Sequence, residues 1–108
     1  MRVYGFMMNG NHGFVEIENM LKAEQEFVGG RIEVISITDE IDLVCNDEGK
    51  ILELMPSLAI MDNSEIVDVI CGNCFLCRFD DEGNLNDIKD DDIEKIKEKV
   101  SLITALQE

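Results

Sequence analysis

The chain has 108 residues, 45% of them apolar and 31% charged, and this balance is typical of a single folded domain spanning residues 1–108. Its 24 Asp and Glu side chains outnumber the nine Lys and Arg side chains, so the net charge at neutral pH is −15. This charge argues against direct binding to nucleic acid or to anionic membranes, because both attract basic protein surfaces.

The first third of the chain predicts a hairpin followed by a short helix. Two apolar segments, residues 2–8 and 14–17, flank a turn rich in Asn and Gly, which indicates two antiparallel strands. Asn19 is a candidate N-cap for a helix over residues 20–28, since its side chain can accept from an unpaired backbone N–H. Gly29-Gly30 supplies the left-handed stop of that helix.

The middle of the chain predicts further strands. Residues 32–37 alternate in a pattern that indicates a strand with one deeply buried face, and residues 41–45 indicate another. Residues 51–54 indicate either a short strand or the first part of a connection. The most apolar run is residues 66–79. It contains Gly72-Asn73, which predicts a bulge, a bend or a break between two strands.

The C-terminal segment predicts an amphipathic helix. Its apolar residues recur every three or four positions at Ile93, Ile96, Val100, Ile103 and Leu106, which places them on one helical face. The acidic residues before this segment would complement the positive end of the helix dipole. The predicted fold class is therefore α+β, a small and mainly antiparallel sheet with one short helix after the second strand and one C-terminal amphipathic helix.

Several segments spread over almost the whole chain carry a family resemblance. They are Val3-Tyr4, Glu16–Asn19, Phe27–Gly30, Ile32–Val34, Val44–Lys50, Ile70–Gly72, Leu85 and Asp91–Glu94. Through them the chain resembles domain-of-unknown-function family 3846, whose members look like cargo of phages, plasmids and conjugative elements of Gram-positive bacteria. The resemblance implies an accessory role against, or alongside, host machinery and does not imply an enzyme.

The cysteines and the single histidine offer no clear chemical site. Cys71, Cys74 and Cys77, with Cys45, have the ligand count of a zinc or iron–sulfur site. In a strand, however, Cys71 and Cys77 face one side and Cys74 the other, so we expect free thiols in the core. Free thiols and a start without a secretory signal favour the cytoplasm. We expect His12 to be an exposed turn residue, and we expect no catalytic residue, metal or cofactor.

The acidic side chains are the main functional signal. Residues 80–98 contain nine acids and three lysines, and residues 39–53 contain six acids and one lysine. One interpretation is that the charge only keeps the protein soluble. The sharper interpretation is a non-enzymatic protein whose carboxylates stand in for phosphates on the basic surface of a host protein, as an anti-CRISPR or anti-restriction nucleic-acid mimic would. The residues predicted to bind this partner are Asp80, Asp81, Glu82, Asp90, Asp91, Asp92 and Glu94.

Two alternative functions stay open. A small-ligand module that binds a nucleotide would need backbone N–H groups near a glycine turn and a nearby cation. The candidates are Gly10, Gly13, Gly29 and Gly30 for the turns and Arg2, Arg31 and Arg78 for the cation. A self-assembling interaction domain would instead pair an exposed edge strand across a two-fold axis to form a homodimer.

Overall fold

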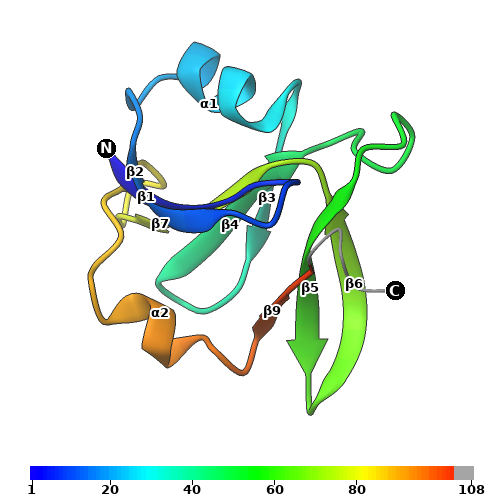
Figure 1. Ribbon diagram of the computed structural model, residues 1–108. Helices are drawn as coiled ribbons and strands as arrows, with labels where there is room; N and C mark the ends of the chain where they lie inside the picture. The colour runs from blue at the N-terminus through cyan, green and yellow to red at the C-terminus, as the bar shows by residue number, and fades with distance from the viewer. Residues whose placement is uncertain (104–108) are drawn as a thin grey trace.

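The computed structural model describes residues 1–103, which form two antiparallel sheets and two short helices (Figure 1). The large sheet has the order β2-β1-β7-β4-β3, with β8 added beside β7, and the small sheet has the order β6-β5-β9. The strands of the large sheet are β1 (Arg2–Phe6), β2 (His12–Glu16), β3 (Ile32–Ser36), β4 (Ile41–Asn46), β7 (Cys74–Phe79) and β8 (Leu85–Asn86). Those of the small sheet are β5 (Pro56–Asp62), β6 (Glu65–Cys71) and β9 (Val100–Leu102), and the helices are α1 (Leu21–Val28) and α2 (Asp92–Lys95).

The α+β class and the mainly antiparallel sheet are confirmed, and so is the first hairpin. Strands β1 and β2 pair from Arg2 opposite Glu16 to Phe6 opposite His12. No helix in residues 1–103 is long and apolar enough to cross a membrane.

The core consists of two apolar clusters on opposite faces of the large sheet. Leu43 and Leu76 pack toward the small sheet, whereas Val44 and Phe75 pack on the side of α1. In Figure 1, α1 lies on one side of the large sheet, and α2 and the small sheet lie on the other. Because β7 is central and its residues 74–77 are buried, these four residues are continuously apolar rather than alternating.

Helix α1 ends as its sequence predicts but does not begin as predicted. The predicted cap is wrong: Met20 occupies the N-cap position without a side-chain bond, and the Asn19 amide donates to the Leu85 carbonyl instead. The predicted stop is confirmed, because Gly29 adopts φ 85° and its N–H donates to the Gln25 carbonyl.

The strand predicted at residues 32–37 is real but lacks the deeply buried face that its pattern indicated. It is β3, which ends at Ser36 and lies at the edge of the large sheet, so every one of its side chains keeps some exposure. Of the two alternatives for residues 51–54, the short strand is wrong and the connection is confirmed. That segment is a turn in which the Leu54 N–H donates to the Gly49 carbonyl.

The apolar run of residues 66–79 is broken as predicted. Gly72, at φ 97°, separates β6 from β7, and the chain crosses there from the small sheet to the large one. A glycine is needed at this corner because few other residues adopt a positive φ without strain.

The long C-terminal helix is wrong. Helix α2 ends at Lys95, and the chain then extends into β9, which pairs with β5 from Leu58 opposite Leu102 to Ile60 opposite Val100. Ile93, Ile96 and Val100 nevertheless all pack in the core between the sheets. They reach it from α2, from the turn after α2 and from β9, and not from one long helix. Ile103 lies just beyond β9 with its N–H on the Ser57 carbonyl, and Leu106 lies outside the described residues.

Candidate functional site

The seven acidic residues predicted to bind a partner lie in four different environments, and the turn over residues 80–84 contains two of these. Asp80 organises the turn over residues 80–84, because one of its carboxylate oxygens accepts from the backbone N–H groups of Glu82 and Asn84 at 2.9 Å each. The hydrogen bond from Asn84, with the others, lowers the pKa of Asp80 below its ordinary value. Asp81 and Glu82 stand exposed on this turn and form no ion pair with any described residue.

Asp92 is not available to a partner, which corrects its place in the predicted set. Its side chain is 0% exposed, and both carboxylate oxygens accept from the Arg78 guanidinium at 2.7 Å. The Lys89 backbone N–H donates to the same carboxylate at 2.8 Å. The hydrogen bonds from Arg78 hold the pKa of Asp92 below its ordinary value, so this residue is a buried structural anion.

The remaining three predicted residues are exposed but lie beside cations of their own chain. Asp90 forms an ion pair with Arg2, Asp91 is 3.6 Å from the Lys95 ammonium, and Glu94 is 3.3 Å from that of Lys97. Exposed pairs of this kind are weak, so a partner's lysines and arginines can compete for these carboxylates.

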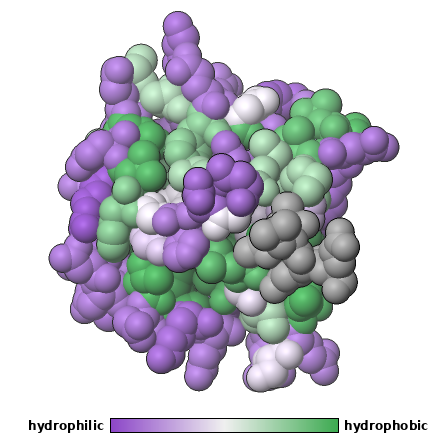
Figure 2. All heavy atoms as spheres, in the orientation of Figure 1, coloured by the Kyte–Doolittle hydropathy of each residue, from purple (hydrophilic) through white to green (hydrophobic). Residues whose placement is uncertain are grey.

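The surface as a whole keeps a large excess of carboxylates outside ion pairs. In residues 1–103, eight of the 23 Asp and Glu side chains form ion pairs, whereas six of the nine Lys and Arg side chains do so. Figure 2 shows hydrophilic residues around most of the outline of the face it draws. The folded protein therefore presents many unneutralised carboxylates and few unneutralised cations.

All four cysteines are free thiols, and burial makes Cys45, Cys74 and Cys77 poor ligands and nucleophiles. Cys74 packs in the cluster between the sheets and Cys77 in the cluster under α1, so these two face opposite sides of the large sheet, as predicted. Burial raises the pKa values of Cys45, Cys74 and Cys77 to about 12. Across residues 1–103, no three His, Cys, Asp or Glu side chains are placed to hold a metal ion.

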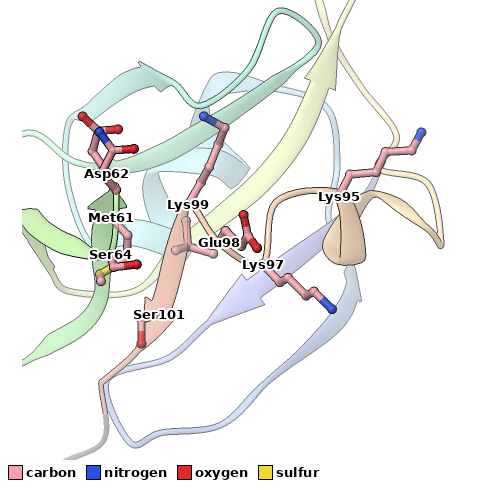
Figure 3. Close-up of a pocket in the computed structure, with 10 residues that line it drawn as sticks. Met61, Asp62, Ser64, Lys95, Lys97, Glu98, Lys99 and Ser101 are labelled. Atoms are coloured by element: carbon pink, nitrogen blue, oxygen red, sulfur yellow. The ribbon is translucent and has the colours of Figure 1, made fainter.

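A groove that the sequence did not indicate runs beside β9. One cavity of about 610 Å³ lies between the β5–β6 turn and residues 95–101 (Figure 3). A second cavity of about 410 Å³ adjoins it and is more apolar. The second is lined by Tyr4, Phe6, His12, Leu58, Ile93, Lys97, Val100, Ser101 and Leu102. Both cavities are bordered by Lys97, Val100 and Ser101, and together they are called here the β9 groove.

Aromatic side chains of the first hairpin form one end of the β9 groove. The Tyr4 hydroxyl lies 2.6 Å from His12 Nδ1, and the His12 ring stacks on Phe6 with the centroids 6.3 Å apart. His12 is the first residue of β2, so the prediction that it lies in a turn is wrong. The alternation of Tyr4 with Phe6 and of His12 with Phe14 was the signal for this aromatic face, because alternate residues of a strand share a side.

The arginines considered for a nucleotide site lie elsewhere and have partners. Arg2 stacks over the Phe14 ring at 3.8 Å and pairs with Asp90, and Arg31 pairs with Asp47. The Arg78 side chain is only 13% exposed and is held by Asp92 and Glu40. The cation that borders both cavities of the β9 groove is Lys97.

Comparison with known proteins identifies the family. A family model described as a domain of unknown function (DUF3846) matches residues 4–101, so the chain belongs to that family. No curated protein and no solved structure matches the chain.

Proposed function

We propose that this member of the DUF3846 family is a non-enzymatic accessory protein that binds a basic surface of a host protein through its carboxylates. The partner class that fits best is a nucleic-acid-processing enzyme, such as a CRISPR or restriction enzyme, whose phosphate-binding groove the carboxylates would occupy. The protein would then act as a mobile-element anti-defence factor. Charge of one sign on the protein and of the opposite sign on the partner would steer the two together and make binding sensitive to salt.

The observation that supports this proposal is the imbalance of ion pairing on the folded surface. Fifteen described carboxylates are left outside ion pairs, whereas most of the cations are already paired within the chain. The turn over residues 80–84 contributes in a specific way. Because the Asp80 carboxylate fixes the backbone of this turn, Asp81 and Glu82 project from a preorganised loop, which lowers the entropic cost of binding.

The proposed contact surface is therefore narrower than the sequence indicated. Asp81 and Glu82 form its centre. Three further exposed carboxylates belong to it, and a partner would have to displace the ion pairs that they form within the chain. These pairs are Asp90–Arg2, Asp91–Lys95 and Glu94–Lys97. Asp80 and Asp92 support the fold of this region instead of touching the partner.

Capture of the partner from host lysate tests the proposal. The tagged protein is incubated at low and high salt, with competing double-stranded DNA in half of the samples, and we expect a nucleic-acid-binding protein that salt or DNA displaces. The double variant D81K/E82K should lose this protein. E48K/E53K is the matched control, because it changes the net charge equally on exposed residues of a different loop. Equal capture by both double variants would show that charge alone, or no specific surface, is responsible.

A further inference from the structure

The aromatic end of the β9 groove has the chemistry of a platform for a flat ring. Tyr4 and Phe6 lie on the same side of β1, and His12 lies beside them on β2. The contact between the Tyr4 hydroxyl and His12 Nδ1 holds the exposed imidazole in one orientation. Nucleobases stack on aromatic faces of this kind irrespective of base identity.

The other end of the β9 groove contains three of the nine Lys and Arg residues of this acidic protein. Lys95, Lys97 and Lys99 all line the larger cavity, together with Ser64, Ser101 and the acidic residues Asp62 and Glu98. Figure 3 shows the three lysine side chains spreading in different directions, so they do not form a closed ring around one anion. Lys97 and Ser101 matter most, because they also border the aromatic cavity.

We propose that the β9 groove binds a free nucleotide, with the base against Tyr4 and His12 and the phosphate beside Lys97 and Ser101. The aromatic cavity of about 410 Å³ lies within the range of small-molecule sites, roughly 300–1,000 Å³. The pair between Lys97 and Glu94 is exposed on both sides, so a phosphate can displace the carboxylate at little cost.

The charge of the protein selects a mononucleotide over a nucleic-acid strand. A chain of net charge −15 repels a polyanion along its whole length, whereas a mononucleotide needs only one local cation. The inference does not rest on the proposed binding of a basic partner, because Tyr4, His12, Lys97 and Ser101 are not carboxylates. The two surfaces meet at Lys97, which pairs with Glu94 at the margin of the proposed contact surface.

Titration of the ¹⁵N-labelled protein with AMP tests the inference, with adenosine, inorganic phosphate and a short single-stranded oligodeoxynucleotide as comparison probes. We expect AMP to shift the backbone amide signals of Tyr4, His12 and Ser101, and to bind more tightly than adenosine or phosphate alone. H12A and K97Q should each weaken AMP binding by about tenfold, the usual loss for one stacked ring or one charged contact. K22Q removes an exposed lysine from α1 and should leave the affinity unchanged.

Three outcomes would overturn the inference. The first is the absence of localised shifts with AMP at millimolar concentration. The second is an equal effect of phosphate and AMP, which would remove any role of the aromatic end. The third is tighter binding of the oligonucleotide than of AMP. Because His12 and Lys97 are both exposed, we expect H12A and K97Q to fold normally. A native-like spectrum of each variant checks this, so weaker AMP binding would then not result from misfolding.

Discussion

Arg78 and Asp92 form a two-point ion pair that joins the central strand β7 to helix α2. The Arg78 Nε and Nη2 groups each donate to a different oxygen of the Asp92 carboxylate at 2.7 Å, and Asp92 is fully buried. A third guanidinium nitrogen reaches Glu40 at 3.0 Å. The pair therefore fixes where the C-terminal segment leaves the large sheet, and α2 consists of a single turn that needs such an anchor.

Loss of this anchor should be costly. We predict that D92N lowers the free energy of unfolding by about 3–5 kcal/mol, because it removes one partner of a buried ion pair and leaves the Arg78 charge uncompensated. The neighbouring D91N is the matched control, since Asp91 is exposed and its pair with Lys95 contributes at most about 1 kcal/mol. Urea unfolding of the two variants measures the difference, and equal midpoints would contradict a special role of Asp92.

The buried thiols should make the fold sensitive to alkali. Burial raises the pKa values of Cys45, Cys74 and Cys77 to about 12, whereas the unfolded chain releases these protons near pH 9. Above that pH the folded state binds more protons than the unfolded state, so stability falls as the pH rises. At pH 10 the loss should be roughly 1–2 kcal/mol for each thiol.

A cysteine variant isolates this effect from the titration of other groups. Urea unfolding measures the free energy of unfolding of the wild type and of C77A at pH 8 and at pH 10 under reducing conditions. The loss of stability between pH 8 and pH 10 should be smaller for C77A, because one of the three raised pKa values is gone. An identical pH dependence in both proteins would show that Cys77 ionises as readily in the folded state as in the unfolded one.

The acidic side of the pH profile follows from other groups and has the opposite sign. Hydrogen bonds from Arg78 to Asp92 and from Lys50 to Asp68 lower the pKa values of these carboxylates. A lowered pKa stabilises the fold above the unfolded value near 4, and this contribution disappears as the pH falls through the folded pKa. We therefore predict that D92N has a flatter loss of stability below pH 4 than D91N, measured by the same urea unfolding. Parallel curves would contradict it.

The sequence predicted local features better than the partners of each segment. The hairpin, the stop at Gly29 and the break at Gly72 follow from backbone preferences of a few residues, and all three are confirmed. The C-terminal helix failed because the spacing of Ile93, Ile96 and Val100 fits a helix, whereas pairing of β9 with β5 supplies hydrogen bonds that no local pattern encodes.

The candidate site shows the same limit. The sequence identified the acidic residues but not which of them form structural contacts inside the fold. The Arg78–Asp92 pair, for example, joins positions 14 residues apart. The β9 groove was missed for a related reason. Its aromatic end comes from β1 and β2 and its lysines from residues 95–99, so only the tertiary fold places them together.

Gly49 should tolerate no side chain. A Cβ atom at this position would overlap the carbonyl oxygen of Cys71, because the loop after β4 packs directly on the end of β6. We predict that G49A destabilises the protein by about 1–3 kcal/mol or more, the usual cost of overpacking. G13A is the control, since a Cβ there meets no atom within 4 Å. Thermal unfolding compares them, and equal melting temperatures would mean that the loop can move away freely.

The edge strand β6 carries two neighbouring exposed apolar residues, Ile66 and Val67, which are 60% and 59% exposed. Asp68 pairs with Ile60 and Ile66 with Met61, so Val67 forms a bulge on this strand. The strand contains Glu65 and Asp68 but no Lys or Arg, and two copies pairing through it would gain no compensating charge. We therefore predict a monomer at neutral pH by sedimentation velocity.

Near pH 4.2 the net charge approaches zero, so the repulsion between copies is lost and β6 becomes free to associate. I66S/V67S should suppress this association, because it removes the apolar surface that would be buried. V34S is the control, since Val34 is a comparably exposed apolar residue on β3, an edge strand of the large sheet. Dimers at neutral pH that survive I66S/V67S would contradict the prediction and place the self-association surface on a different strand.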